Sequence, residues 1–269
     1  MSDDAAPPAA RDPVQHLASL TPARIGLGRS GISIPTRASL AFNAAHAAAR
    51  TAVHHALDVA TMTAVLAPLH IPVLTVRSRA PDRTTYLQRP DFGRRLDEAS
   101  SRCLAEIDAV PADLAIVVAD GLSALAVERN APTLVRLLIE HARGAGYSLA
   151  PLVIASEARV ALGDEIGERL RARIVVVLIG ERPGLSSPDS LGVYLTFGPR
   201  VGRTDAERNC ISNVRDGGLV AEAAERKLAY LIAEALRLGL SGVDLKDRSD
   251  EQAGFVVPRH RNFLIEPEA

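Results

Sequence analysis

The chain has 269 residues, which is enough for one large domain or two smaller ones. Hydrophobic residues make up 47 % of it and charged residues 23 %, so a buried core is expected. Aromatic residues are only 3 % and Trp is absent, so Ala, Val, Leu and Ile must fill that core. The net charge of −1 argues against a nucleic-acid or acidic-membrane partner, because both need a basic excess.

The cysteines and the apolar runs exclude further classes of protein. Cys103 and Cys210 form neither a disulfide framework nor a zinc-binding spacing. No apolar run approaches the roughly 20 residues of a membrane-spanning helix. The N-terminal stretch MSDDAAPPAARDP lacks the apolar region of a signal peptide. We therefore predict a cytoplasmic protein that contacts neither nucleic acid nor a membrane.

The N-terminal third is predicted to be helical after a disordered start. Residues 1–15 are acidic and rich in Pro and Ala, and we expect no fixed structure there. A long helix is predicted over 36–58, with Thr36 as its N-cap. The small face of this helix would let another backbone approach closely, and it consists of Ala41, Ala44, Ala45, Ala48 and Ala52.

A second domain is predicted beyond this helix. The intervening segment is short, extended and broken by two prolines, and a new helix is expected after Pro90. We place the domain boundary near Tyr86. This gives an N-terminal disordered arm and helical region (1–85) and a larger domain (86–269).

Strands and helices alternate in the larger domain. Apolar runs predict strands at 113–120, 148–156, 173–181 and 191–198, and periodic segments predict helices at 133–146, 162–171 and 221–239. Strands separated by helices are typical of a mostly parallel sheet. We therefore predict an α/β fold, with a Rossmann-like sheet flanked by helices and preceded by a smaller helical region.

A glycine-rich segment near the N-terminus raises a first hypothesis about function. Gly26, Gly28 and Gly31 in GLGRSG match the G-x-G-x-x-G pattern of dinucleotide-binding proteins. That pattern needs a strand before it and a helix that opens on it. Here LTPAR precedes the glycines and Pro35 intervenes before the helix. A turn or a loop pressed against a partner is favoured, and an NAD(P)-dependent oxidoreductase is the alternative.

The end of the strongest predicted strand suggests a ligand site. RIVVVLIG runs directly into Glu181, and ligands of open parallel sheets sit outside the carboxyl ends of the strands. Gly180 and Gly184 lack side chains, so a large ligand could touch the backbone. A solvated glutamate at an ordinary strand exit is the alternative.

Cys210 is a second candidate, in the polar stretch TDAERNCISN (204–213). A nucleophilic cysteine needs a nearby base and an electropositive site, and no histidine lies close in sequence. A small buried thiol among hydrogen-bonding groups is therefore favoured.

Motifs for metals, nucleotides and an altered cobalamin ligand are missing. The seven histidines are scattered, and the chain contains no H-E-x-x-H, no Cys/His cluster and no P-loop. We predict no metal site and no catalytic residue. The chain also lacks a D-x-H-x-x-G motif, which would replace the lower ligand of a cobalamin.

Several longer segments carry a family resemblance. They are ARIGLGRSG, YLQRPDFGRRL, VVADGLSA, LIGERPGLSSPDSLGVYLTFGPRVGRTDAERNCISN and AERKLAYLIAEALRLGLSGVDLKD, and they cover most of the chain from Ala23 to Asp247. Together they resemble the small (light) subunit of ethanolamine ammonia-lyase. The tail from Arg248 onward lies outside the resemblance and is assigned no role.

The resemblance implies a carbon–nitrogen lyase that uses adenosylcobalamin, held base-on, to convert ethanolamine to acetaldehyde and ammonia. It implies that the large subunit binds ethanolamine and carries the catalytic residues. The small subunit, itself non-catalytic, closes the cobalamin cleft. Whether such a complex lies in a bacterial microcompartment or free in the cytosol stays open, as does a scaffold role without any ligand.

The resemblance also implies three cobalamin contacts. They are Val160 in SEARVALGDEIGE, Glu181 in GERPG and Cys210 in RNCISN. A corrin is broad and apolar but is rimmed with amide arms. We therefore expect Glu181 to accept a hydrogen bond from an amide, and Cys210 to provide shape and a weak polar contact.

Overall fold

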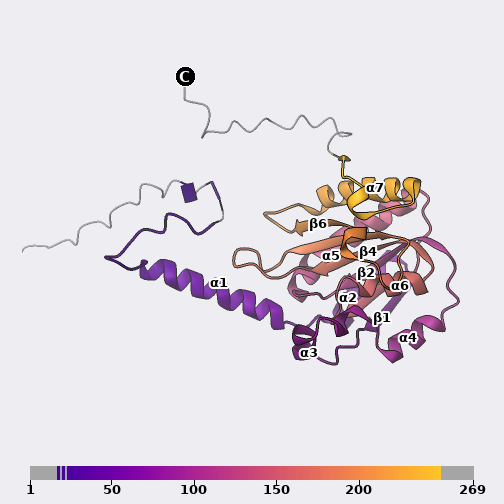
Figure 1. The fold of residues 1–269 in the computed structure, drawn as a ribbon, viewed down its shortest axis with the longest axis horizontal. Helices are drawn as coiled ribbons and strands as arrows, with labels where there is room; N and C mark the ends of the chain where they lie inside the picture. Colours follow the sequence, from indigo (N-terminus) through magenta and orange to yellow (C-terminus); the bar gives the residue numbers. More distant parts are fainter. Residues whose placement is uncertain (1–16, 19, 22, 250–269) are drawn as a thin grey trace, which may run out of the picture.

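The computed structural model describes residues 17, 18, 20, 21 and 23–249. The predicted disordered segment 1–15 and nearly all of the tail after Asp247 lie outside these residues. Six strands form one sheet in the order β1-β3-β2-β4-β5-β6 (Figure 1). Their bounds are β1 Val73–Arg77, β2 Ala112–Ala119, β3 Leu152–Ser156, β4 Ala172–Gly180, β5 Leu191–Phe197 and β6 Arg208–Val214.

The sheet is mixed. Strands β1, β3, β2 and β4 are parallel, whereas β5 and β6 are antiparallel to their neighbours. The change of direction follows from chain length, because only residues 181–190 join β4 to β5 and a parallel crossover needs about a dozen residues or more. The predicted α/β class is confirmed. A Rossmann-like character stays a prediction.

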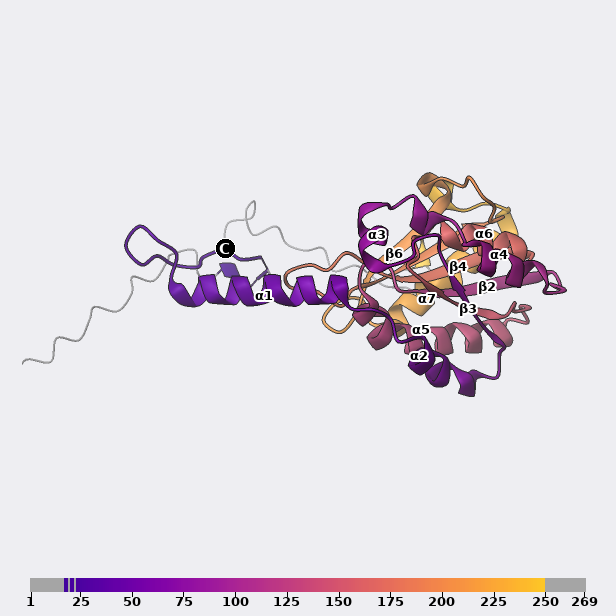
Figure 2. The same cartoon turned by 90° about the horizontal axis from the view of Figure 1, so that it is seen from below.

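Helices cover both faces of the sheet (Figure 2). One face packs against α2 (Val59–Leu66), α5 (Ala124–Gly144) and α7 (Ala221–Leu238), and the other against α4 (Glu98–Ala105) and α6 (Leu162–Arg169). Helix α3 (Arg83–Gln88) lies between β1 and α4 in the chain, and α1 (Thr36–His54) projects from the body. Short 3-10 turns lie at Ala67–Leu69, Phe92–Arg94, Asp205–Glu207 and Gly242–Asp244.

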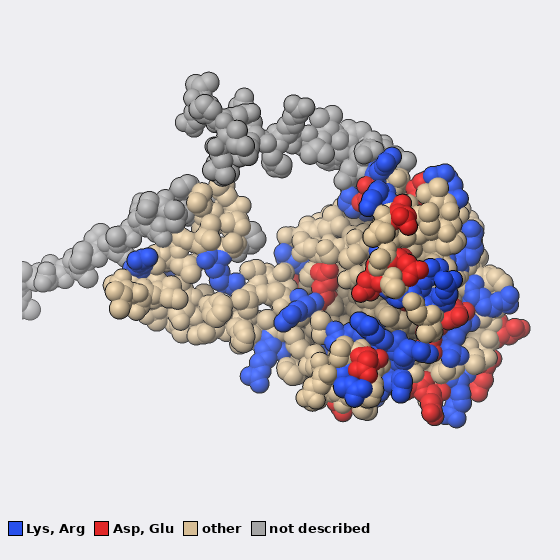
Figure 3. All heavy atoms as spheres, in the orientation of Figure 1, with Lys and Arg blue, Asp and Glu red and all other residues tan. Residues whose placement is uncertain are grey.

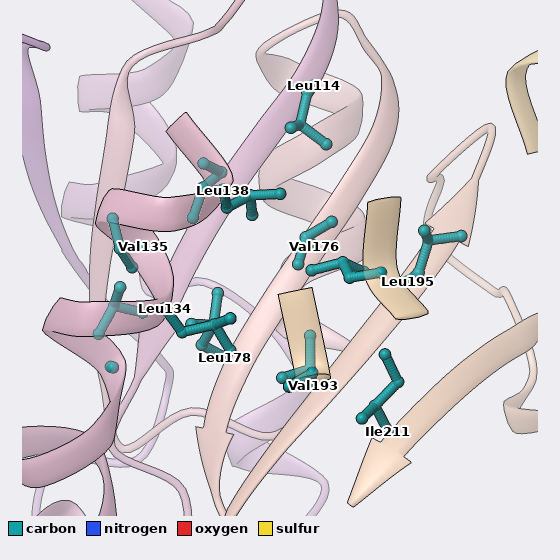
Figure 4. Packing of buried hydrophobic residues seen from close by; sticks show 14 of the residues in the cluster. Leu114, Leu134, Val135, Leu138, Val176, Leu178, Val193, Leu195 and Ile211 are labelled. Carbon is teal, nitrogen blue, oxygen red and sulfur yellow. The ribbon is translucent and has the colours of Figure 1, made fainter. Parts of the chain in front are cut away.

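The core is aliphatic, as the composition predicts. Figure 4 shows its centre, where side chains of α5 meet those of the strands: Leu134, Val135 and Leu138 face Leu114, Val176, Leu178, Val193, Leu195 and Ile211. Each fully buried side chain of this kind contributes about 1.5–3 kcal/mol. Among the described residues, Tyr86 is the one aromatic side chain that is fully buried.

The structure differs from the predicted elements at several places. Helix α5 begins at Ala124 behind the N-cap Ser123 and continues through Pro132, so it starts earlier than predicted. Strand β6 occupies the stretch predicted to be irregular. Thr36 is the first helical residue of α1, and Pro35 occupies the N-cap position.

Two further expectations concern domains and membranes. Strand β1 precedes the predicted boundary near Tyr86 and pairs with β3, so the sheet draws on both predicted regions. Whether the chain divides there into two folding units stays a prediction. Among the described residues, no single helix has the length and apolarity to cross a membrane, and α1 with Val59–Leu69 passes that test only as a pair bent by 80°.

Two glycines allow β4 to end against the turn that follows β2. A Cβ on Gly180 would lie 2.0 Å from the Ser123 carbonyl oxygen, and one on Gly121 would lie 2.3 Å from the Gly180 oxygen. The amide of Leu122 donates to that same Gly180 oxygen at 2.9 Å. The missing side chain of Gly180 therefore makes room for the protein's own backbone, and a ligand contact with this backbone stays a prediction.

We expect Gly180→Ala to lower the free energy of unfolding by about 1–3 kcal/mol, because the backbone must shift to admit the methyl group. Urea unfolding of the full chain measures the loss. Gly144→Ala is the matched control, since its Cβ would meet nothing within 4 Å. Equal stability of the two variants would show that the close backbone approach at Gly180 does not limit the stability of the fold.

Candidate functional site

A cavity lies where the connections of the sheet change direction. The chain leaves β2 through α5 on one face to reach β3, and returns through α6 on the other face to reach β4 on the far side of β2. Ligands of open α/β sheets bind at the carboxyl ends of the strands at such a switch point. A cavity of about 450 Å³ occupies this position, and its lining includes Tyr86, Gly121, Arg159, Val160, Glu181 and Tyr194.

A second, larger hollow is not a comparable site. It measures about 640 Å³, and all its lining residues come from α1 and the residue after it, including Asn43, His46, Arg50 and His54. One helix provides only one wall, so this hollow is an open surface. The cavity at the switch point has walls from several elements and is the better candidate for a ligand.

Glu181 lies at the carboxyl end of β4, as predicted, and lines the cavity. Its Oε2 accepts hydrogen bonds from the Ser190 hydroxyl and, at 3.3 Å, from the Asn213 amide. Its own amide donates to the Ser190 carbonyl at 2.9 Å. Among the described residues no group donates to Oε1, so one carboxylate oxygen is held in place and the other is free to accept from a ligand.

Val160 lines the same cavity from the loop between β3 and α6. It is half-buried and packs against the core on the α6 side of the sheet. The structure therefore brings together Val160 and Glu181, which lie far apart in the sequence. They offer an apolar surface and a carboxylate to one space.

Cys210 lies beside this cavity and does not line it. It pairs with Tyr194 across β5 and β6, and the two side chains share a hydrogen bond. Tyr194 lines the cavity, so it connects Cys210 to the site. The expectation of a buried thiol is wrong, because Cys210 is exposed on an edge strand.

The environment of Cys210 does not activate the thiol. Partial desolvation against the neighbouring strand raises the pKa of Cys210, and the charge of Glu181 raises it further, although the bond from Tyr194 lowers it. A protonated thiol is a poor nucleophile. A buried ion pair between Arg208 of β6 and Asp164 of α6 fixes the strand two residues away.

A buried network that sequence reasoning missed holds the cavity wall. The carboxylate of Asp120, directly after β2, accepts from the amides of Gly121 at 2.8 Å, Glu157 at 2.7 Å and Ala158 at 2.9 Å. Arg83 of α3 approaches Asp120 at 3.5 Å and Glu157 at 3.1 Å. One guanidinium thus serves two buried carboxylates. Burial, together with the charge of Glu157, raises the pKa of Asp120 to about 6.

The same network holds the loop that carries Val160 in an unfavourable conformation. Glu157 has a φ of 52°, which costs a residue with a side chain about 1–2 kcal/mol. Its amide donates to Asp120, and its carbonyl accepts from the Ser78 hydroxyl at 2.6 Å. These bonds fix the chain direction just before Arg159 and Val160 enter the cavity wall.

Tyr86 lines the cavity and lies close to two guanidinium groups. Arg83 lies 4.8 Å and Arg159 4.3 Å from the centre of its ring. The hydroxyl of Tyr86 donates to the Ala158 carbonyl at 3.0 Å, and burial raises its pKa. Within the described part of the chain, Nη2 of Arg83 and Nε of Arg159 have no hydrogen-bond partner. Tyr86 and Arg159 line the cavity, so its wall combines an aromatic ring with a cation.

The glycine-rich segment does not have the context of a dinucleotide site. Gly26, Gly28 and Gly31 all have positive φ, and Ser30 and Ser33 form a small bridge around the last of them. Among the described residues the first strand is β1, which begins well after this segment, and α1 starts behind Pro35. Neither the preceding strand nor the helix opening on the glycines is present, so the favoured interpretation of a turn fits better.

The fold and the site define an α/β protein with a candidate ligand cavity at the switch point of its sheet. No cluster of three or more His, Cys, Asp or Glu residues that could hold a metal occurs among the described residues. The family model of the ethanolamine ammonia-lyase light chain matches residues 11–246. The chain therefore belongs to the ethanolamine ammonia-lyase light-chain family.

The sequences of three similar proteins match this chain over nearly its full length. The ethanolamine ammonia-lyase small subunit of Xanthomonas campestris pv. campestris is 53 % identical over 98 % of this chain and 99 % of its own. That of Pseudomonas paraeruginosa is 55 % identical over the same shares. That of Azotobacter vinelandii is 56 % identical over 90 % of this chain and 91 % of its own.

We expect Asp120→Ala to lower the free energy of unfolding by at least about 3 kcal/mol, because it leaves three buried amides without an acceptor. Asp120→Asn retains one carbonyl oxygen and should lose less. Urea unfolding measures both. Asp91→Ala, which removes an exposed partner of Arg89, is the control and should change little.

The pH dependence provides a second measurement of the same network. The pKa of Asp120 is higher in the folded chain than its ordinary value of 3.8, so the folded state binds this proton more tightly. Its contribution to stability therefore falls as the pH rises from about 4 to about 6. The deficit of Asp120→Asn relative to the unchanged chain should be largest near pH 4 and shrink toward pH 6. A deficit that grows over this range would contradict the raised pKa.

Proposed function

We propose that this chain is the non-catalytic small subunit of an adenosylcobalamin-dependent ethanolamine ammonia-lyase. In this proposal it closes the cobalamin cleft against a large subunit, which binds ethanolamine and carries the catalytic residues. The reaction converts ethanolamine to acetaldehyde and ammonia. The observation that carries the proposal is the shared cavity of Val160 and Glu181, two residues that the family resemblance assigns to cobalamin.

The size of the cavity supports the proposal that this chain forms only one side of the cofactor site. Pockets of about 300–1,000 Å³ bury most of a drug-sized ligand. A corrinoid is considerably larger, so a cavity of about 450 Å³ accommodates only part of it. The remainder of the cofactor then needs a second protein surface, as the words "small subunit" in the names of the relatives suggest for this chain.

The chemistry of the lining fits the edge of a corrin. A flat apolar ring with amide arms calls for apolar contact and for a few fixed hydrogen-bonding groups. Val160 provides the apolar contact, and Glu181 Oε1 accepts from an amide nitrogen. Tyr194 fills the space beside Glu181, and Cys210 supports Tyr194 from the neighbouring strand.

The protein's own contribution is binding and orientation. When bound base-on, adenosylcobalamin supplies the cleavage of its cobalt–carbon bond, and the protein supplies placement and exclusion of competing reactions. Ser190 and the Asn213 amide fix Glu181 Oε2, so the carboxylate does not have to be ordered when the ligand arrives. The Asp120 network likewise fixes the loop that carries Val160 before the ligand arrives.

Two alternatives predict different behaviour. A self-sufficient NAD(P)-dependent oxidoreductase would bind its nucleotide as the isolated chain, and the turn at Gly26–Gly31 gives it no structural support. A scaffold subunit would contribute no cobalamin contact even in the complex. A cytoplasmic location, inside or outside a microcompartment, stays a prediction.

One experiment separates the three functions. The chain is co-purified with the cognate large subunit, and adenosylcobalamin and ethanolamine are then added. The proposal expects a cobalamin spectrum that changes on binding and release of acetaldehyde only when both chains are present. If the large subunit alone is active and binds cobalamin as tightly as the complex does, this chain contributes no cobalamin contact. That result would support the scaffold function.

We expect Glu181→Ala to weaken cobalamin binding by the complex and to leave the KM for ethanolamine nearly unchanged. Loss of one charge-assisted hydrogen bond costs about 1.5–3 kcal/mol, which is roughly a 10- to 150-fold rise in Kd. Spectroscopic titration with cobalamin measures it. Glu140→Ala removes an exposed glutamate of α5 and is the control. An unchanged Kd would remove Glu181 from the site.

We expect Cys210→Ser to retain near-normal turnover. The raised pKa keeps the thiol protonated at neutral pH, so its role is contact and not attack. Acetaldehyde release by the co-purified complex measures this, with Cys103→Ser as the control for loss of an exposed thiol. Complete loss of turnover while cobalamin stays bound would instead favour a chemical role.

A further inference from the structure

The N-terminal arm, defined as the described residues within 17–57, extends away from the body of the protein (Figures 1 and 2). It contains α1, in which only Ala52 is buried out of 19 residues. Helices in proteins gain most of their stability by packing one face. Helix α1 buries none of its side chains beyond its last turn within the described part of the chain. We therefore expect its exposed face to bind a partner.

The composition of the arm indicates what kind of surface would bind it. Leu40 is 63 % exposed, Phe42 45 % and Ile34 59 %, which is unusual for large apolar side chains in one short segment. The arm has four arginines, at positions 24, 29, 37 and 50, and no Asp or Glu between 17 and 57. Figure 3 shows this contrast, with no acidic residue visible on the arm and both charge signs mixed over the body. An apolar surface with an acidic rim is complementary to it.

The root of the arm is fixed beside the candidate site. Nε of Arg83 donates to the carbonyl of Val53 in the last turn of α1 at 2.7 Å. The same guanidinium contacts Glu157, in the network that holds the cavity wall. His55, directly after α1, pairs with Glu128 of α5 at 2.9 Å. The root of the helix is thus held by α5 and by the network that supports the cavity wall.

The tip of the arm turns back toward the same edge of the sheet. Nη2 of Arg24 donates to the carbonyl of Leu185 at 3.2 Å, and Leu185 belongs to the loop that starts with Glu181. Arg24 also stacks over Phe42 of α1 at 5.9 Å. A protein that covers the cavity must therefore pass close to the arm.

We propose that the arm is a docking element for the large subunit of the same lyase. The face of α1 that carries Leu40, Ala41, Ala44 and Ala48 enters an apolar groove of that subunit, and the arginines meet an acidic rim. Small residues on this face allow a close backbone approach. The inference rests on the proposed function, because that function supplies the protein that covers the cavity.

Other occupants fit the arm less well. Four arginines spread over 41 residues are sparse for a polyanion such as nucleic acid, which is bound through clustered basic residues. A membrane is disfavoured by the polar face of α1 with Asn43, His46 and Arg50. A second copy of this chain shows mixed charges on the face of its body seen in Figure 3, and a dimer formed through the arm is an outcome of the test below.

The test compares three substitutions of exposed alanines in helices, each made in the full chain. Ala44→Glu places an acid on the docking face, Ala44→Lys places a base of similar size there, and Ala233→Glu changes an exposed position of α7. Binding to the immobilised cognate large subunit is measured for each. We expect Ala44→Glu to weaken binding by at least about a hundredfold, because it brings like charges together. Ala44→Lys should lose less, and Ala233→Glu should bind like the unchanged chain.

The outcomes distinguish this inference from the proposed function. If the unchanged chain binds the large subunit and Ala44→Glu binds equally well, the docking role is wrong while the proposed function stands. If the unchanged chain does not bind the large subunit, the proposed function fails first. If the chain alone forms dimers that Ala44→Glu abolishes, the arm binds a second copy and the inference is overturned. Circular dichroism of each variant confirms that the body is folded.

Discussion

The hydrogen-bonded carboxylate of Asp120 is the interaction on which the edge of the sheet with the candidate cavity depends. It lies at the carboxyl end of the central strand β2, and it joins that strand to the loop after β3 through the amides of Glu157 and Ala158. Without a buried acceptor these amides would have no partner, and the left-handed conformation of Glu157 would be unsupported. Arg83 offsets the buried charge and extends the connection to α3 and to the end of α1. The cavity wall and the root of the arm therefore share one support.

Chain length sets the second constraint. The short connection between β4 and β5 cannot cross over, so β5 and β6 add to the sheet in antiparallel order. This places Tyr194 next to β4, on the face that also carries α6, with Cys210 on the next strand beside it. Glu181 is then held between Ser190 at the start of β5 and the amide of Asn213 in β6. A parallel continuation of the sheet would have left Glu181 without these neighbours.

Much of the fold was predictable because buried parallel strands are continuous apolar runs, and β2 and β4 are of this kind. Strand β6 was missed because it lies at the edge of the sheet and its sequence RNCISNV is mostly polar, without a continuous apolar run. The start of α5 was missed because Pro132 looks like a boundary, yet nine buried side chains hold the helix through it. In such cases tertiary packing outweighs a local preference.

The candidate site was predictable only in part. Glu181 was found because a polar residue directly follows an apolar strand, and Asp120 and Glu157 follow β2 and β3 in the same way. That signal was present in the sequence and indicates three residues at one edge of a parallel sheet. Arg83 and Tyr86 had no comparable signal, because they come from a short helix outside the sheet's alternation and meet the site only through the fold.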